Sequence, residues 1–413
     1  MATIPSIAMI PSGYKASKLY SVLPTDGTGD FTTTRASVAT RVNESGLIEE
    51  VAANVPRLDY SDGTCPSLLL EPASTNLVVQ SQVFSGYNKG NAVLADNVII
   101  SPDGTLNGAS FTDDNIGGTG IVQMFESVTV DISSAYTWSI FAKKKDNDFI
   151  ILRPNAFTTP LSDNSSFDLV NGTVFSEGVG HTAKIENYGN GWYRCSITFT
   201  TDAVDTSGSL IARLSTNGSA TTLNLDGTNS IYTWGWQFEK NSYATSYIKN
   251  AGTALGVTRV ADTATGSGNS TVINSSEGVL YAEISALAND GTTRYISLND
   301  GSNSNDVRLY FDSSSYISVL SKVAGTTQVF LQSNSYTQTD FNKIAFKYKE
   351  NDFALWINGV EVGTDLSGIT NSIGTLNQLS FFGNNLPFYG KTKSVQVYTT
   401  ALTDAELANL TTI

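Results

Sequence analysis

The sequence predicts an all-β protein with two antiparallel β-sandwich (jelly-roll) domains. Charged residues make up only 15% of the chain, against roughly 25% in typical soluble domains. Ser, Thr, Asn and Gly take their place, and these residues favour turns and exposed strand faces. Apolar and polar residues alternate along many short segments between Gly and Asn turns, as in half-buried antiparallel strands. Hydrophobic residues reach 40%, so each domain can bury a core.

The 413 residues are enough for two or three domains. Residues 1–75 contain six prolines, which exclude long helices and central strands. We therefore expect an extended, irregular N-terminal segment that lies along another subunit or wraps the following domain. Turn-separated alternating strands predict one sandwich over residues 76–255 and a second over residues 276–413. Residues 256–275 are small and polar, and we expect a linker there.

Two local signals in the second sandwich are specific. The stretch FALWINGVEVGT holds the dipeptide Asn358–Gly359 between two apolar runs, which predicts a β-hairpin. Near the end of the chain, Thr403 is followed three residues later by Glu406 and then by Leu407 and Leu410. That spacing is a capping box, and it predicts one short C-terminal helix.

The charge of the chain excludes several classes of partner. The formal net charge is -14 and the sequence pI is near 4.5, so nucleic acid and anionic membranes are not expected partners. No apolar run approaches the roughly 20 residues that a membrane helix needs. The first residues, MATIPSIAMIPSGYK, lack the basic start and apolar core of a secretory signal. We expect a protein that is not exported by the usual route.

The sequence offers no catalytic cluster, and we expect no enzyme and no catalytic residues. His181 is the single histidine and has no G-x-S-x-G nucleophile motif beside it, so we expect an exposed loop residue. No E-x-D-x-E run supplies the paired carboxylates of glycoside hydrolysis. Cys65 and Cys195 are too few for a disulfide framework. Cys195 lies in a strand-like segment and is expected to be a buried thiol.

Calcium is the one metal that the sequence makes worth considering, and no other cofactor is expected. The run from Asn299 to Asp306 holds several oxygen ligands, with Asp300 and Asp306 as the candidate calcium ligands. It lacks the spacing of an EF-hand loop. An Asx-rich turn needs no ion, and this interpretation is favoured.

Aromatic residues give the candidate carbohydrate-binding sites, because sugars are usually bound on exposed aromatic faces. Tyr232, Trp234, Trp236 and Phe238 recur at period two, which predicts one strand face, and a sandwich core is favoured there over a binding platform. The better surface candidates are Tyr87 in FSGYNKG, together with Phe388 and Tyr389 in GNNLPFYG. Both loops are rich in Gly and Asn.

Three stretches resemble known families. Residues 10–80 resemble a module common in bacteriophage virion proteins, with the words GLIE at 46–49, PRLDY at 56–60 and LEPASTN at 70–76. The middle unit, with YTWSIFAKK, GNGWYRCSITF and WGWQFEKNSYATSYI, is similar to carbohydrate-binding-module jelly-rolls. The C-terminal unit, with FALWINGVEV and ALTDAELANL, resembles concanavalin A-like and laminin G-like sandwiches.

The resemblance implies a structural protein of a bacteriophage virion, a head or tail fibre or appendage. It implies assembly in the host cytoplasm, attachment to other virion proteins through residues 1–75, and adhesion to a host-surface glycan through lectin-like sandwiches. Such appendages are homo-oligomers, with a trimer favoured because a symmetric bundle buries extended segments. Two alternatives stay open: a capsid decoration protein with a purely structural role, and a particle-borne glycan depolymerase.

Overall fold

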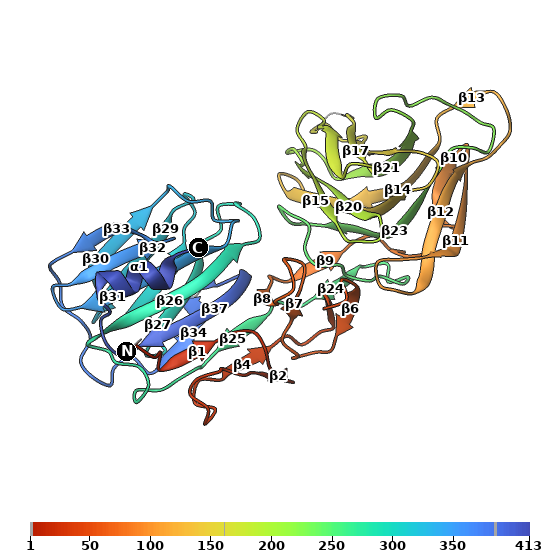
Figure 1. Ribbon diagram of the computed structural model, residues 1–413. Helices are drawn as coiled ribbons and strands as arrows, with labels where there is room; N and C mark the ends of the chain where they lie inside the picture. Colours follow the sequence, from red (N-terminus) through yellow and green to blue (C-terminus); the bar gives the residue numbers. More distant parts are fainter. Residues whose placement is uncertain (1–2, 161, 384–385) are drawn as a thin grey trace. The chain divides into compact units, whose positions relative to one another are not determined.

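The structure is a computed structural model that describes residues 3–160, 162–383 and 386–413. The described chain is almost entirely β, with antiparallel sheets and one short helix (Figure 1). This confirms the predicted fold class. The chain divides into two compact units. Unit 1 comprises Met1–Val38, Val51–Pro72 and Val260–Ile413, and unit 2 comprises Ala39–Glu50 and Ala73–Arg259.

Unit 1 is a sandwich of two main sheets. The larger sheet has the order β33 (Val360–Asp365), β32 (Phe353–Ile357), β31 (Asn342–Lys349), β26 (Glu277–Ala286), β37 (Gly390–Tyr398), β8 (Ser67–Leu70) and β7 (Leu58–Asp59), with β1 (Ile7–Met9) also paired to β37. The second sheet has the order β30 (Thr326–Ser333), β29 (Ile317–Val323), β28 (Asp306–Phe311), β27 (Arg294–Asn299) and β34 (Gln378–Ser380). Alternate side chains such as Leu280, Leu309 and Phe346 are fully buried in the shared core.

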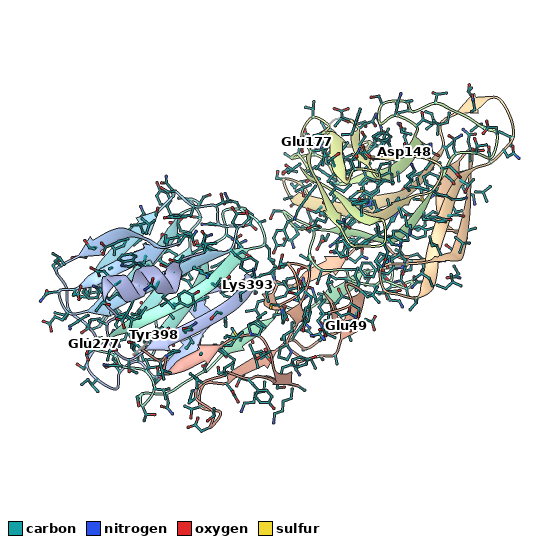
Figure 2. All side chains as sticks on the ribbon, viewed as in Figure 1. Glu49, Asp148, Glu177, Glu277, Lys393 and Tyr398 are labelled. Atoms are coloured by element: carbon teal, nitrogen blue, oxygen red, sulfur yellow. The ribbon has the colours of Figure 1, made fainter. Side chains whose placement is uncertain are left out.

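The C-terminal helix α1 (Asp404–Thr411) has the predicted capping box, in which Thr403 and Glu406 bond reciprocally. Leu407 packs with Trp356 and with Tyr398, labelled in Figure 2, in a cluster separate from the main core. The Asn358–Gly359 turn joins β32 to β33 as predicted. The part of the chain that the structure describes contains no helix with the length and hydropathy of a membrane span.

Residues 1–75 are not a separate segment, which corrects the expected domain boundaries. Ile7 pairs with Val397 and Leu68 with Thr392, so the segment adds strands beside β37. Phe31 is fully buried in the core of unit 1. Residues 39–50 and 73–75 belong to unit 2. The prolines interrupt the segment, but the short apolar runs between them still supply strands and core side chains.

Buried ion pairs hold the early part of the chain within unit 1. Arg57 donates to Glu71 at 2.5 Å and also to Asp262, while Arg35 donates to Asp262 at 3.0 Å. These four side chains are at most 5% exposed. The expected linker over residues 256–275 is also corrected, because Asp262 and the core residue Ala264 lie in it.

Unit 2 is a second two-layer sandwich. One sheet has the order β10 (Asn88–Gly90), β14 (Gln123–Thr129), β21 (Ser207–Ser215), β16 (Phe149–Asn155), β17 (Ser165–Asp168) and β18 (Thr173–Ser176). The other has the order β11 (Ala92–Ile100), β12 (Leu106–Asp113), β23 (Ser230–Glu239), β15 (Ala135–Lys144), β20 (Trp192–Thr200) and β19 (Thr182–Asn187).

Small sheets of two or four short strands complete the two units. They are β2 (Tyr14–Lys15), β3 (Lys18–Leu19), β4 (Phe31–Thr34) and β25 (Thr263–Thr265) in one sheet; β5 (Ala39–Val42) with β6 (Ile48–Val51); β9 (Ser74–Asn76) with β24 (Val257–Arg259); β13 (Thr119–Gly120) with β22 (Leu223–Asn224); and β35 (Phe382–Gly383) with β36 (Leu386–Pro387).

The aromatic side chains of β23 do not all lie on one face of the strand, in contrast to the prediction. Trp236 and Phe238 are buried in the main core of unit 2, whereas Trp234 belongs to a second cluster, with Tyr232 packed against it. The register against β15 shifts at this point, and Gly235 between the two tryptophans has φ 62°. A bulge of this kind reverses the direction of the side chains that follow. The expectation that these rings form core rather than a binding platform fits their burial.

Candidate functional site

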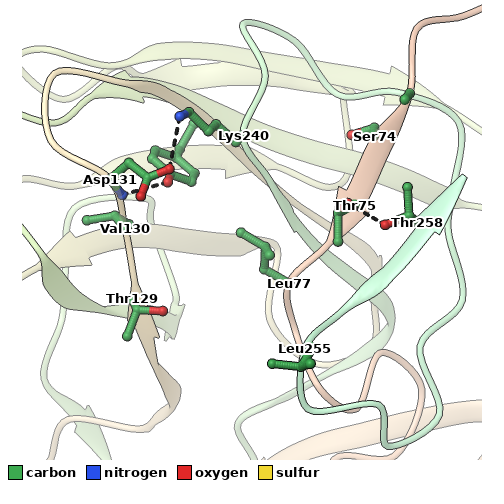
Figure 3. Close-up of a pocket in the computed structure, with 11 residues that line it drawn as sticks. Ser74, Thr75, Leu77, Thr129, Val130, Asp131, Lys240, Leu255 and Thr258 are labelled. Atoms are coloured by element: carbon green, nitrogen blue, oxygen red, sulfur yellow. Dashed lines mark hydrogen bonds and ion pairs between the residues drawn. The ribbon is translucent and has the colours of Figure 1, made fainter. Parts of the chain in front are cut away.

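A hollow of about 510 Å³ opens on unit 2 (Figure 3). We call it the unit 2 pocket. Its lining brings together hydroxyl groups, one carboxylate, one ammonium and apolar side chains from the segments around β9, β14, β15, β23 and β24: Ala73, Ser74, Thr75, Leu77, Thr129, Val130, Asp131, Tyr136, Lys240, Leu255 and Thr258. Its size lies within the usual range for small-ligand sites, about 300–1,000 Å³.

Two pairs of polar residues stand around this pocket. Lys240 Nζ donates to Asp131 Oδ2 at 2.9 Å, and both side chains are more than half exposed. This hydrogen bond raises the pKa of Lys240, so the ammonium stays charged. Thr75 and Thr258 share a hydrogen bond of 2.7 Å between their hydroxyls. Each pair keeps unused donor or acceptor capacity that a ligand can meet.

The floor of the unit 2 pocket is held rigid from below. Tyr136 stacks on Phe238 with ring centroids 4.9 Å apart, and its hydroxyl accepts a hydrogen bond from the Asp131 amide at 2.8 Å. The pairing of β9 with β24 places Thr75 opposite Thr258. Leu255, in contrast, is 93% exposed at the edge. The pocket therefore combines a fixed floor with an accessible apolar side chain.

Sequence reasoning missed the unit 2 pocket. Thr75 and Thr258 are 183 positions apart, and Asp131 and Lys240 are 109 apart. No motif joins them, because the β9–β24 pairing and the loop before β15 bring them together only in the fold. Ala73, Ser74 and Thr75 fall in the stretch LEPASTN, but nothing in that stretch indicates a pocket.

The outer face of the five-stranded sheet in unit 1 is polar yet closely packed. Tyr295 and Tyr310 lie with ring centroids 4.8 Å apart, and the Arg308 guanidinium stands 5.2 Å over the Tyr295 ring. All three are at most 8% exposed. Burial raises the pKa of Tyr310 to about 12. This face offers little free aromatic surface to a ligand.

The surface aromatic candidates are placed differently from the expectation. Tyr87 is 5% exposed and Phe388 is 1% exposed, so the prediction that they present open rings is wrong. Tyr87 packs edge-on against Trp236, and its hydroxyl donates to Gln80 O. Phe388 belongs to the core of unit 1, with the partly buried Tyr389 packed against that core. Two positions of the GNNLPFYG loop, 384 and 385, lie outside the described residues.

The candidate calcium ligands are occupied by protein donors. Asp300 accepts from Ser302 and Asn305, the arrangement of an Asx-rich turn. Asp306 is 2% exposed and paired with Arg308. Burial raises the pKa of Asp306 despite that partner. Among the described residues, no group of three or more His, Cys, Asp or Glu side chains could hold a metal ion.

The lone histidine and the cysteines are set apart from the unit 2 pocket lining. His181 is 6% exposed, which corrects the expectation of an exposed residue, and its Nδ1 lies 2.8 Å from Ser165 Oγ. Burial lowers the pKa of His181, so the ring is neutral at pH 7. Cys195 is a buried free thiol as predicted, and Cys65 is exposed and free.

A family model matches part of the chain. Residues 265–408 match the concanavalin A-like lectin/glucanases superfamily, as a laminin G-type domain. This span includes every strand of the five-stranded sheet and most of the larger sheet of unit 1. Residues 265–408 of unit 1 thus match a concanavalin A-like, laminin G-like domain, in agreement with the resemblance of the C-terminal unit. No curated protein matches the chain.

Several solved structures are similar to parts of the chain. The sialidase carbohydrate-binding module CBM40 of Ruminococcus gnavus, bound to α2,3-sialyllactose, is 19% identical; the match covers 35% of this chain and 86% of that one, with a TM-score of 0.29. Domain 4 of the arabinanase AbnA of Geobacillus stearothermophilus, in complex with arabinotriose, is 14% identical over 37% and 73%, with a TM-score of 0.30. Mouse laminin α1 domains LG4-5 are 8% identical over 81% and 92%, with a TM-score of 0.23. These likenesses have no bearing on ligand or activity.

Proposed function

We propose that this protein is a non-catalytic, glycan-binding surface protein that holds a saccharide in the unit 2 pocket. The observation that carries the proposal is the lining of that pocket. Hydroxyls of Thr75 and Thr258 and the charged pair Asp131–Lys240 border one hollow. Sugar hydroxyls both donate and accept, so they suit a site that offers both kinds of group beside apolar side chains such as Leu255.

Two further observations concern the class of ligand and the chemistry of the pocket. The match of residues 265–408, in unit 1, to a superfamily of lectins and glucanases makes a sugar ligand the natural class to test. Hydrolysis of a glycosidic bond needs a pair of carboxylates about 5–10 Å apart. The described lining of the unit 2 pocket contains one carboxylate, Asp131, and it is ion-paired with Lys240.

The test is a glycan array with the full chain, followed by calorimetric titration of the best saccharide. Lys240→Ala and Leu255→Asp change exposed side chains at the unit 2 pocket and leave the core intact. We expect each to weaken binding roughly tenfold, the loss typical of one charge-assisted hydrogen bond or one apolar contact. Lys184→Ala is the matched control, because Lys184 is 63% exposed and lies in β19 of the same unit. Binding that survives both pocket variants unchanged refutes the assignment.

We also propose a biological setting, a head or tail appendage of a bacteriophage particle assembled in the host cytoplasm. The proposal is supported by the resemblance of residues 10–80 to virion modules, and it includes attachment to other virion proteins and a homo-oligomer, with a trimer favoured. Deleting residues 1–75 would remove core strands, so attachment is better tested at exposed apolar positions. Ile10 and Val22 are each 47% exposed.

Ile10→Asp and Val22→Asp are expected to keep the fold and to reduce incorporation into particles, measured by quantitative mass spectrometry of purified virions. Unchanged incorporation of both variants contradicts attachment through this surface. Copy number in the same measurement separates the alternatives, since hundreds of copies per particle indicate a capsid decoration protein and a few indicate an appendage. Release of oligosaccharide from host envelope polysaccharide would identify a depolymerase.

A further inference from the structure

Two arginines are neighbours on the outer face of the six-stranded sheet that contains β16 and β21 in unit 2. Ile150 and Leu152 of β16 point into the core, so Arg153 lies on the opposite face. In the antiparallel register, Arg153 is opposite Ile211 and Ile151 is opposite Arg213. The two arginines are therefore diagonal neighbours on adjacent strands, with Cβ atoms about 7–8 Å apart or slightly less.

The two guanidinium groups donate hydrogen bonds to amide side chains rather than to carboxylates. Arg213 Nε donates to Gln123 Oε1 at 3.1 Å, and Arg153 Nη1 donates to Asn164 Oδ1 at 3.3 Å, so both partners are uncharged amides. Among the described residues, neither arginine forms an ion pair within 4.0 Å. Arg153 Nε is also buried without a hydrogen-bond partner. Burial, and then the charge of Arg153, lower the pKa of Arg213, but a guanidinium stays charged.

The nearby carboxylates already have other donors. Asp163 accepts from the backbone amides of Val179 and Asn164, and these bonds, more than the charge of Arg153, lower its pKa. Asp168, on the same sheet, accepts from the amides of Val170 and Asn171. Diagonal neighbours on adjacent strands are within reach of long side chains, so the two positive charges repel each other. In a chain of net charge -14, an unneutralised arginine pair is a local exception.

The surroundings of the arginines are apolar and aromatic. Ile151 is fully buried and Ile211 is 7% exposed, although neither belongs to the main core, so neighbouring side chains of the outer face shield them. Phe149 and Phe175 form an edge-to-face pair with centroids 5.2 Å apart, and Phe175 is 50% exposed. Phe149 lies on the same outer face of β16 as Arg153, so planar cationic forks and an aromatic pair share one face. Such a face matches a ligand that carries both carboxylates and apolar ring faces.

We propose that this face, here called the arginine face and defined by Gln123, Arg153, Asn164, Phe175 and Arg213, binds a saccharide that carries carboxylates, such as a uronic acid polymer. The arginine forks bind the carboxylates in bidentate fashion, the amides of Gln123 and Asn164 bind ring hydroxyls, and Phe175 covers a sugar face. The sugar nature of the ligand rests on the proposed function. The residues are different from those of the unit 2 pocket.

The experiment titrates the full chain with trigalacturonate at low salt by calorimetry. Arg153→Gln and Arg213→Gln remove charge while keeping hydrogen-bonding side chains, and each is expected to weaken binding by roughly tenfold or more. Arg213→Lys keeps the charge but loses the fork, and it should recover binding only in part. Lys249→Gln, an exposed residue of the same unit, removes equal charge and should change the affinity less than twofold. Thermal melts confirm that each variant is folded.

Four further measurements can overturn or delimit the assignment of the arginine face. Equal affinity for galactotriose, which lacks carboxylates, overturns the proposal, as does binding that persists in both Gln variants. Competition by inorganic phosphate as strong as that by trigalacturonate indicates a general anion site and overturns the sugar assignment. Equal, arginine-dependent binding of polyglutamate indicates a protein partner and overturns it too. The pocket variant Lys240→Ala should leave trigalacturonate binding intact, so failure of the pocket and failure of the arginine face are distinguishable.

Discussion

Replacing Arg57 with methionine would leave Glu71 without this ionic partner in the interior of unit 1. Arg57 is fully buried and donates to Glu71 and Asp262, and both carboxylates are at most 5% exposed. Burial alone would lower the pKa of Arg57, but Asp262 and Glu71 outweigh it and raise that pKa. Breaking a buried pair by removing one partner costs about 3–5 kcal/mol, because an uncompensated charge remains. We expect that loss in the free energy of unfolding of unit 1.

Hydrogen exchange followed by mass spectrometry can measure this loss in unit 1 specifically. Trp356 is the single tryptophan of unit 1, whereas the other four lie in unit 2, so fluorescence would report mostly on unit 2. Amides of β26 and β37 should exchange on the order of 10² to 5 × 10³ times faster in Arg57→Met, which is the loss of about 3–5 kcal/mol at about 1.36 kcal/mol per tenfold. Unit 2 peptides should be unchanged.

Two further variants make the result decisive. Adding Glu71→Gln to Arg57→Met removes one of the uncompensated carboxylates and should restore part of the protection. Lys184→Ala, which removes an exposed ion pair with Glu186, should cost no more than about 1 kcal/mol. A loss below about 1 kcal/mol in Arg57→Met would refute the reasoning, because the cluster would then contribute no more than a surface pair.

Three other predictions concern stability. Phe388→Ala should cost about 3–5 kcal/mol in chemical denaturation because the ring fills the core of unit 1, whereas Phe382→Ala, at 39% exposure, should cost far less; equal costs would contradict the placement of Phe388. Burial tends to raise the pKa of Asp113, but hydrogen bonds from Asn229 and Gly227 outweigh burial and lower that pKa. The ionised carboxylate therefore stabilises the fold above the unfolded pKa of about 3.9, and this stabilisation is lost as the pH falls through the lower folded pKa. The melting temperature of Asp113→Asn should lie below that of the wild type near neutral pH, with a difference that narrows in acid; a difference that does not change with pH argues against this role of Asp113. Thr403→Ala should cost about 1 kcal/mol through loss of the helix cap, seen as faster exchange in α1, and unchanged exchange there would show that the cap contributes little.

Local patterns predicted the local structure well. The Asn-Gly dipeptide gave the β32–β33 hairpin, and the spacing of Thr403 and Glu406 gave the capping box, because both depend on residues that are close in sequence. Alternation predicted the strands and the class of fold. The bulge at Gly235 is a local departure that alternation did not predict. It places Trp234 and Trp236 on opposite faces of the strand, because one extra residue interrupts the alternation of side chains.

Long-range pairing set the limits of that prediction. Prolines in the first 75 residues suggested a segment outside the domains, but partners such as Val397 for Ile7 lie hundreds of positions away. Loop composition likewise suggested open rings at Tyr87 and Phe388, although tertiary packing buries both. The composition of a loop does not indicate which parts of the fold pack over its side chains. The unit 2 pocket and the arginine face were missed for the same reason, because strands distant in sequence assemble them.

The central claim is that the unit 2 pocket binds a saccharide. The most direct measurement is the NMR or calorimetric titration of the full chain with the best saccharide from the glycan array, for the wild type and for Lys240→Ala. Chemical shift changes centred on Thr75, Asp131 and Thr258, together with an affinity loss of roughly tenfold in the variant, are the predicted result. Changes that map elsewhere, with equal affinity for both proteins, would contradict it.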